Sequence, residues 1–436
     1  MLFKRGISRR AYNTNHYADV EIVMELKPRA HEKIVQLLNK GVHIPNPLTL
    51  DIGDEVTVDQ ISSNGVMIYP GCRIYGAGTV ISSGVQLGKE GPVTVDNCQL
   101  GPSVELKAGY VNKSVFLEKA NMSSGAHVRE GCILEEEANG AHCVGLKQTI
   151  LFPFVTLGSL INFCDCLMAG GTSRKDHSEV GSSYIHFNFT PDGNKTTASL
   201  FGDVPRGVML NQPAIFLGGQ GGVVGPARLG FGTVVAAGSV VRTDVPEDKK
   251  LIIAQAHPGA VKDFMAHAYK NLSRIVGNNI IYLANLVSLE QWYRYIRRPF
   301  FNRQEFGTLM YAGALENLSL AKKERLSRLK ALVEKVPKSN AVKNHLLENI
   351  DPVCALFEAE LPDGTISGSR DRFLAAFHEN TQGTAKDYIR AIQTLPPAVA
   401  EQGTTWLQQI IDSLCSRVAS MLKSLDMFSP HNNSLQ

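Results

Sequence analysis

The sequence predicts a parallel β-helix of six-residue repeats, followed by an all-α C-terminal domain and preceded by a short helical N-terminal segment. The chain has 436 residues, of which 39 are glycine, and only 7% are aromatic. The glycines recur with aliphatic residues from about residue 51 to about residue 245, and helical patterns replace them from about residue 258. We therefore expect an N-terminal segment at 1–48, a β-helix at 49–256 and a helical domain at 257–436.

The N-terminal segment contains one amphipathic pattern, which lies between residues 26 and 40. Ile34, Leu37 and Leu38 fall on one face of a helix, a proline stands near the start, and Gly41 follows the end. Proline near the first turn and glycine after the last turn are typical helix boundaries. This pattern predicts a short amphipathic helix.

The six-residue period is clearest in VVGPARLGFGTVVAAGSVV. A period of six matches neither an α-helix nor an alternating strand, but each unit of a parallel β-helix forms a short strand and a corner. Glycine relieves crowding at the corners, and the aliphatic side chains stack into an interior column. Hairpins in a sandwich are the alternative, but the Asn-Gly and Asp-Gly pairs that hairpins favour are rare here. The aliphatic residues at this spacing are Val223, Leu229, Val235 and Val241, then Ile68, Ile74 and Val80, and also Val128 and Leu134.

Charge, hydropathy and cysteine spacing exclude several kinds of partner. A net charge of +3 is too weak to predict a nucleic-acid or anionic membrane partner. No run of about 18 apolar residues predicts a membrane span, and the basic start lacks the apolar stretch of a secretory signal, so we expect a cytoplasmic protein. A disulfide between Cys164 and Cys166 would be strained, and neither cysteines nor histidines have a zinc-ligand spacing, so no metal is expected.

Three segments carry a family resemblance. LGFGTVVAAGSVVRTDVPED (residues 229–248) resembles the last coils of the left-handed β-helix acyltransferases of the hexapeptide-repeat superfamily. It is most similar to the acetyltransferase domain of the bifunctional N-acetylglucosamine-1-phosphate uridyltransferases. NFTPDGNKTTASLFGD (188–203) is similar to that family's Asn-Tyr-Asp-Gly loop, and RKDHSEVG (174–181) to the segment with its catalytic histidine. The resemblance implies left-handed coiling and a homotrimer.

The resemblance also implies a coenzyme A-dependent acyltransferase, with acetyl-CoA as co-substrate and an amino-sugar phosphate or sugar nucleotide as acceptor, in the cleft between β-helices. An imidazole titrates near neutral pH, so His177 is the candidate general base. Asn188 would hold the substrate. Lys195, Lys175 and Arg174 would meet a phosphate. A histidine that caps a turn and solvated surface cations remain the alternatives.

The last matched segment would bind the cofactor. Ala236, Ala237 and Gly238 are small enough for a pantetheine arm to lie against the backbone, and Arg242 resembles the family's contact to the nucleotide end. Small residues also simply fit β-helix corners, so this signal discriminates poorly.

The sequence departs from the family pattern in places that bear on catalysis. Phe189 replaces the family's tyrosine, two residues are inserted before Asp192, and the interval from His177 to Asn188 is shorter than in the family. His186 is therefore a rival base. A Pro-rich excursion after Leu200 interrupts the coils, and we expect it to line the cleft.

Two other functions stay open. One is a non-catalytic scaffold that binds a sugar nucleotide. The other is a protein related to UDP-N-acetylglucosamine pyrophosphorylase that lacks the nucleotidyltransferase domain, since about fifty residues before the coils cannot hold that domain.

The C-terminal region predicts helices throughout. An apolar stripe runs from Val261 through Phe264 and Met265 to Ile275. The run WYRYIRRPFFNR (292–303) mixes bases and aromatics as a nucleic-acid or membrane surface can, but a helix that packs its aromatics is the favoured interpretation. Helices after a β-helix can also cap its last coil.

Overall fold

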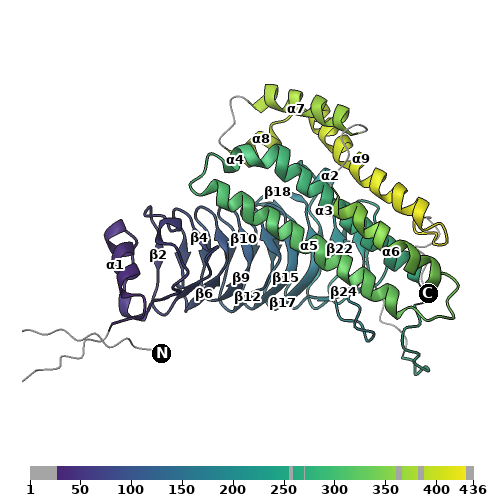
Figure 1. The fold of residues 1–436 in the computed structure, drawn as a ribbon, viewed down its shortest axis with the longest axis horizontal. Coiled ribbons are helices and arrows are strands. Elements are labelled where there is room, and N and C mark those ends of the chain that lie inside the picture. Colours follow the sequence, from purple (N-terminus) through teal and green to yellow (C-terminus); the bar gives the residue numbers. More distant parts are fainter. Residues whose placement is uncertain (1–26, 255–258, 270, 360–365, 382–386, 429–436) are drawn as a thin grey trace, which may run out of the picture.

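The computed structural model describes residues 27–254, 259–269, 271–359, 366–381 and 387–428, and over these the predicted fold class is confirmed. A short helix leads into a parallel β-solenoid, and a helical region returns along the side of the solenoid (Figure 1). The predicted boundary between the solenoid and the helical domain lies outside the described residues. The left-handed coiling stays a prediction.

The solenoid has three faces, each a column of parallel strands that pair with the turns before and after. Face 1 consists of β1 (Asp51–Ile52), β3 (Arg73–Tyr75), β6 (Val93–Asp96), β9 (Gly109–Asn112), β12 (Ala126–Val128), the first halves of β15 (Val144–Leu151) and β17 (Ile161–Met168), β21 (Ile185–Phe187), β24 (Gly222–Val224) and β27 (Val240–Val241). Face 2 consists of β4 (Val80–Ile81), β7 (Gln99–Leu100), β10 (Ser114–Phe116), β13 (Cys132–Leu134), the second halves of β15 and β17, β22 (Ser199–Phe201) and β25 (Arg228–Leu229).

Face 3 is a separate ten-stranded sheet. Its strands are β2 (Met67–Ile68), β5 (Gln86–Leu87), β8 (Glu105–Leu106), β11 (Asn121–Met122), β14 (Asn139–Gly140), β16 (Thr156–Leu157), β20 (Glu179–Val180), β23 (Phe216–Leu217), β26 (Val234–Val235) and β28 (Leu251–Ile252).

The six-residue register places successive aliphatic residues on successive faces. Val223 lies on face 1, Leu229 on face 2 and Val235 on face 3, and all three point inward and are buried. Val241 then returns to face 1, where it pairs with Val223. The interior is therefore built by repetition, as the spacing predicts.

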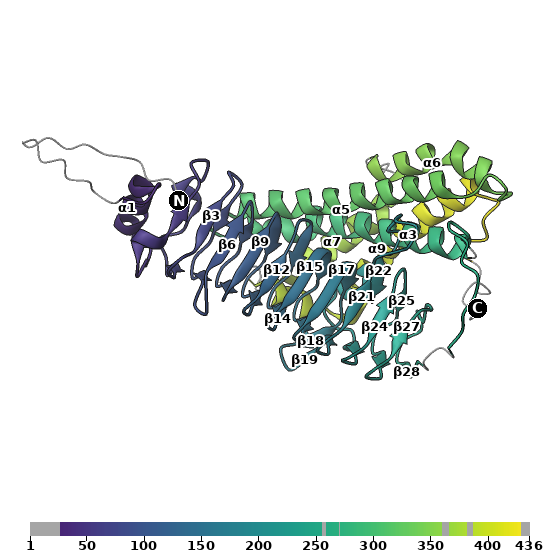
Figure 2. The same cartoon turned by 90° about the horizontal axis from the view of Figure 1, so that it is seen from below.

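The helical region packs along face 2 and does not merely cap the last turn. Helix α5 contacts β7, β10 and β13, and α3 contacts β22, so the covered strip runs along much of the solenoid (Figure 2). The helices are α1 (His31–Lys40) before the solenoid, α2 (Val204–Gly207) within it, and α3 (Leu272–Trp292), a π-helical turn (Tyr293–Arg297), α4 (Arg298–Phe301), α5 (Gly307–Lys335), α6 (Lys343–Glu358), α7 (Ser367–Thr381), α8 (Tyr388–Gln393) and α9 (Pro397–Met421) after it. In the described part of the chain, no helix is long and apolar enough to cross a membrane.

Two predictions for this region have different outcomes. The apolar stripe from Val261 to Ile275 predicts a helix, but residues 259–269 are not helical, and Val261, Phe264 and Met265 are exposed, so the prediction is wrong for this part. The end of the stripe, at Ile275, does lie in α3. Without the cover of a neighbouring element, an apolar stripe stabilises no helix. The basic and aromatic run at 292–303 does pack its aromatics in the core, as favoured, and even buries Arg297.

Candidate functional site

A β-hairpin presents His177 at the corner between face 2 and face 3. Its strands are β18 (Gly171–Ser173) and β19 (Asp176–His177), and it leaves the solenoid between β17 and β20. Gly171 has φ +93°, and a Cβ added there would lie 2.5 Å from the Cα of His177. Glycine is therefore required for the hairpin to close next to the histidine.

The imidazole of His177 is oriented by its own hairpin. Its Nδ1 lies 3.0 Å from the carbonyl oxygen of Arg174. Because a carbonyl only accepts hydrogen bonds, Nδ1 carries the proton and Nε2 keeps its lone pair. Nε2 lies 3.9 Å from a carboxylate oxygen of Glu179, and the side chain of His177 is 19% exposed. This arrangement leaves one ring nitrogen free to accept a proton.

The two cations of the hairpin differ in what they contact. Nη1 of Arg174 donates to the carbonyl oxygens of Glu137 (3.1 Å) and Phe154 (2.9 Å) and to Oγ1 of Thr156 (2.8 Å), so it anchors the hairpin to the preceding turns. Lys175 is exposed at the tip. A surface lysine is the better placed of the two to meet an anion.

His186 lies inside the solenoid. It is 1% exposed, its Nε2 is 2.8 Å from Oγ of Ser199, and its ring lies edge-on to those of Phe163 and Phe201. Burial lowers the pKa of His186 to about 4, so its ring is neutral near pH 7. Within one chain this ring faces the apolar interior and not a substrate.

Asn188 and Lys195 lie on the loop between β21 and β22, at the corner between faces 1 and 2. Nδ2 of Asn188 donates to Oδ2 of Asp165 at 2.8 Å. The carbonyl oxygen of Lys195 accepts a hydrogen bond from Nη1 of Arg325 on α5 at 3.2 Å. Arg325 also forms a buried ion pair with Asp165 at 2.6 Å. The loop is thus fixed to the helical region through a buried charge pair.

Sequence reasoning missed this charge pair. Asp165 is an acid within the otherwise largely apolar strand INFCDCLM, and this was the available signal, because a buried carboxylate needs a partner. Arg325 stands in a helix rich in charged residues, where nothing in the sequence marks it as the buried one.

The residues predicted to bind the cofactor lie at a third corner. Ala236, Ala237 and Gly238 join β26 on face 3 to β27 on face 1, and a Cβ added at Gly238 would meet nothing within 4 Å. Arg242 follows β27, is exposed, and its Nη1 donates to the carbonyl oxygen of Val240 at 3.2 Å. This corner has open space for an extended ligand.

The predicted site residues therefore occupy three different corners of one solenoid, and a single copy of the chain does not bring them together. The hairpin lies between faces 2 and 3, the Asn188 loop between faces 1 and 2, and the small residues between faces 3 and 1. A site that uses all of them needs more than one copy.

The Pro-rich excursion after Leu200 packs against the helical region. The backbone N–H of Val204 donates to Oδ1 of Asn285 at 2.9 Å, and Oγ1 of Thr404 donates to the carbonyl oxygen of Pro205 at 3.2 Å. Its apolar residues Val208 and Met209 are buried. This part of the excursion packs the helices against the solenoid, whereas the sequence predicts that it lines a cleft.

The outward side of face 3 changes character along the solenoid. Its last three strands present apolar side chains in register, Phe216, Val234 and Leu251, which are 40%, 41% and 66% exposed. The equivalent outward residues of the preceding strands from β5 to β20 are Gln86, Glu105, Asn121, Asn139, Thr156 and Glu179. Met67 on the first strand, β2, is the one other apolar residue at these outward positions. An apolar patch at one end of a largely polar face is typical of an interaction surface.

The described residues contain no group of three or more His, Cys, Asp or Glu side chains that could hold a metal ion. All eight cysteines are free thiols, and Cys164 and Cys166 are both buried.

Comparison with known proteins relates the repeats to one group. No family model matches the chain. It is 28% identical to "Bifunctional protein GlmU" of Trichlorobacter lovleyi over 219 residues, which are 50% of this chain and 42% of that protein. The GlmU proteins of Thermotoga maritima (27% over 215 residues; 49% and 42%) and Carboxydothermus hydrogenoformans (26% over 246 residues; 56% and 49%) are similar to a like extent. The chain spans less than half the length of these curated relatives. The matches and the parallel solenoid together relate the chain to the hexapeptide-repeat superfamily.

Proposed function

We propose that the protein is a coenzyme A-dependent acyltransferase that acetylates the amine of an amino-sugar phosphate or sugar nucleotide. The observation that carries the proposal is the orientation of His177, whose Nδ1 is bound to the Arg174 carbonyl while Nε2 stays free. Distant similarity to the GlmU proteins supports the reaction class. Acetyl-CoA supplies the activated acyl group.

In this reaction His177 acts as the general base. Its Nε2 accepts the proton that the substrate amine loses as the new carbon–nitrogen bond forms, and returns that proton to the sulfur as the carbon–sulfur bond breaks. Glu179, 3.9 Å from Nε2, stabilises the imidazolium while the proton resides there. His186 supports the interior packing of the same turns and takes no part in proton transfer.

The remaining predicted residues serve binding in this proposal. Lys175 and Lys195 attract a sugar phosphate, helped by the positive charge of Arg174, and Asn188 offers its Oδ1 to the sugar because its Nδ2 is used by Asp165. Ala236, Ala237 and Gly238 fit a pantetheine arm, since the space beside Gly238 is open, and Arg242 is exposed for a nucleotide phosphate. 

A homotrimer completes the site. Because the three sets of residues lie at three corners of one solenoid, only neighbouring copies can place them in one cleft. The exposed apolar residues Phe216, Val234 and Leu251 on face 3 support such contacts between copies.

The test compares two histidine variants of the full chain. We expect thiol release from acetyl-CoA with glucosamine phosphates, and a fall in kcat of roughly 10²–10⁴ for His177→Asn. His127→Asn is the matched control, because His127 is an exposed histidine on face 1, and it should leave kcat unchanged. The mass of the active species is measured by sedimentation. A monomeric active species, or equal activity of the two variants, contradicts the proposal.

A non-catalytic scaffold is the second candidate, and one observation favours it. The guanidinium of Arg174 and the amide of Asn188 are already used by groups within the protein. A scaffold would bind acetyl-CoA or a sugar nucleotide in calorimetry and would release no thiol. Its His177→Asn variant would bind the same ligand as tightly as the parent chain does.

A pyrophosphorylase-related activity is the third candidate, and turnover of uridine triphosphate would have to show it. The described residues form a solenoid with helices along one face and include no doubly wound sheet of the kind that binds a nucleotide in that domain.

A further inference from the structure

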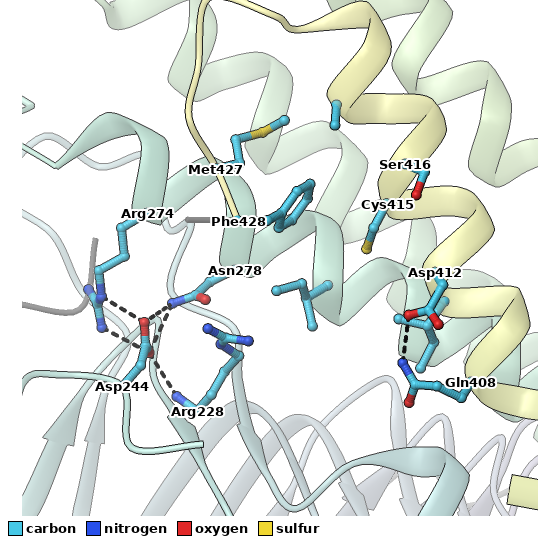
Figure 3. Close-up of a pocket in the computed structure, with 13 residues that line it drawn as sticks. Arg228, Asp244, Arg274, Asn278, Gln408, Asp412, Cys415, Ser416, Met427 and Phe428 are labelled. Carbon is cyan, nitrogen blue, oxygen red and sulfur yellow. Dashed lines mark hydrogen bonds and ion pairs between the residues drawn. The ribbon is translucent and has the colours of Figure 1, made fainter. Parts of the chain in front are cut away.

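A cavity of about 500 Å³ lies between the last turns of the solenoid and helices α3 and α9 (Figure 3). Arg228 on β25 lines it from the solenoid side, Asn278 lines it from α3, and Asp412 and Cys415 line it from α9. Its size is within the range of small-molecule sites. None of the residues assigned above to acyl transfer lines this cavity.

One ion pair in the wall, between Asp244 and Arg274, has its hydrogen bonds satisfied within the protein. Asp244 is buried, and its carboxylate accepts from Nε and Nη2 of Arg274 at 2.9 and 3.1 Å and from Nδ2 of Asn278 at 3.0 Å. Oδ1 also accepts from the backbone N–H of Arg228 at 3.0 Å. The donors around Asp244 therefore leave this carboxylate little capacity for another guanidinium.

The guanidinium of Arg228, by contrast, has no counter-ion in the wall of the cavity. Its guanidinium points into the cavity (Figure 3), and its Nε is buried without a hydrogen-bond partner among the described residues. No carboxylate of the described residues lies within ion-pair distance of it. A buried N–H without a partner is unfavourable in a native protein. The terminal nitrogens of the same guanidinium make no hydrogen bond to the described residues, and they are the groups that can meet an acceptor in the cavity.

The other groups in the wall limit which acceptor fits. Arg274 and Asp244 cancel each other, and Asp412, bonded to Nε2 of Gln408 at 2.8 Å, places one negative charge on the opposite wall. Burial raises the pKa of the Cys415 thiol to about 12, so no thiolate competes for Arg228. A dianion would be repelled by Asp412, whereas a single negative charge next to Arg228 is favoured.

Apart from Ser416, the rest of the lining is apolar. Ile281 lies on α3, Ile411 on α9, and Phe428 follows α9 and is 40% exposed at the cavity. Apolar side chains beside a cation that has no counter-ion favour a ligand that has a hydrocarbon body and one anionic group.

We infer that this cavity binds a small monocarboxylate with a hydrocarbon tail, whose carboxylate pairs with the guanidinium of Arg228 and whose tail lies against Ile281, Ile411 and Phe428. The site is separate from the proposed acyl-transfer site, and it does not depend on that function. It places a ligand between the solenoid and the helical region, in contact with both.

The test is calorimetric titration of the full chain with hexanoate, with its neutral counterpart hexanamide and with inorganic phosphate. We expect hexanoate to bind at least about tenfold more tightly than hexanamide, because a hydrogen-bonded charge pair is lost with the amide. Phosphate should bind more weakly than hexanoate. Arg228→Gln should reduce hexanoate affinity to that of hexanamide and leave hexanamide affinity unchanged.

Two further variants separate the charge from the apolar wall. Arg417→Gln changes an exposed arginine on α9 that does not line the cavity, and should leave hexanoate affinity unchanged. Phe428→Ala should weaken hexanoate and hexanamide alike. Thermal unfolding of each variant shows whether it is folded. The inference is overturned if hexanoate does not bind at millimolar concentration, if Arg228→Gln binds it as tightly as the parent chain does, or if phosphate binds more tightly.

Discussion

Two of the buried charge clusters that join the helical region to the solenoid differ in their balance of charge. The first pairs Asp165 of the solenoid with Arg325 of α5 at 2.6 Å, and Glu324, which lies 3.8 Å from Arg325, is itself paired with Arg328. The second sets two acids at a corner of the solenoid, Glu135 and Glu136, against the single base Arg297 of the π-helical turn. The first cluster is balanced at neutral pH, whereas the second is not unless one acid keeps its proton.

The unbalanced cluster is built around Arg297. Its guanidinium pairs with Glu136, lies 3.5 Å from Glu135, and stacks over the ring of Tyr388 at 3.9 Å. The hydroxyl of Tyr293, four residues before Arg297 in the same π-helical turn, donates to Glu135 at 2.5 Å. Burial raises the pKa of Glu135 to about 7, so this cluster titrates near neutral pH.

The largest loss of stability is expected when the arginine of either cluster, Arg297 or Arg325, is replaced. Arg297→Met and Arg325→Met each leave a buried carboxylate without its cation, and loss of one partner from a buried pair costs about 3–5 kcal/mol. Arg297→Met should lie at the upper end, because it also removes the stacking on Tyr388. Urea unfolding at pH 7 measures both. Arg417→Gln, which removes an exposed arginine, should change the free energy of unfolding by less than about 0.5 kcal/mol.

Glu135→Gln is expected to have a smaller effect on the free energy of unfolding, and to stabilise the fold. A carboxyl whose folded pKa is about 7 and whose ordinary pKa is 4.5 stabilises the fold while it is protonated, and loses that contribution as the pH rises from 4.5 through 7. The variant has no proton to lose. It should therefore be more stable than the parent chain by roughly 1–3 kcal/mol at pH 8, with little of this difference at pH 4.5.

Glu136→Gln relieves the same charge imbalance from the other side. With Glu136 gone, Glu135 becomes the counter-ion of Arg297 and is held in its charged form, so this variant too should keep its stability between pH 4.5 and pH 8, where the parent chain loses stability. Urea unfolding of both variants at the two pH values measures the difference. A gain for Glu135→Gln of the same size at pH 4.5 and pH 8 would show that Glu135 is charged throughout.

The solenoid could be predicted from sequence because its signal is local and repeated. Each six-residue unit carries its own aliphatic residue, such as Val223, Leu229 and Val235, so the interior follows from spacing alone. The apolar stripe from Val261 failed because a helix needs a partner surface, and the sequence does not say where that surface lies. The position of the helices along face 2, instead of over the last turn, likewise depends on contacts between residues far apart in the chain.

The candidate site was predictable only in part. The hairpin that holds His177 follows from the glycines before it, and the open corner at Gly238 follows from its small residues. The burial of His186 could have been predicted from the six-residue register, because it stands six residues after the inward Val180. It is named a rival base only because the interval from His177 to Asn188 is short. Arg228 and Arg325 look like any charged residue in sequence, because their partners, or lack of partners, lie on other elements.

The smallest effect on the free energy of unfolding is expected at the balanced cluster, from the loss of the hydrogen bond between Asn188 and Asp165. Asn188→Ala removes the 2.8 Å hydrogen bond to Oδ2 of Asp165 but leaves the pair with Arg325 intact. Because the charge stays paired and Asn188 is only half-buried, the loss should be about 1 kcal/mol, well below that of Arg325→Met. Asn302→Ala, which changes an exposed asparagine after α4, is the control in the same urea unfolding experiment. An unchanged stability for Asn188→Ala would show that Arg325 alone satisfies Asp165, and that the amide of Asn188 is free to serve a ligand.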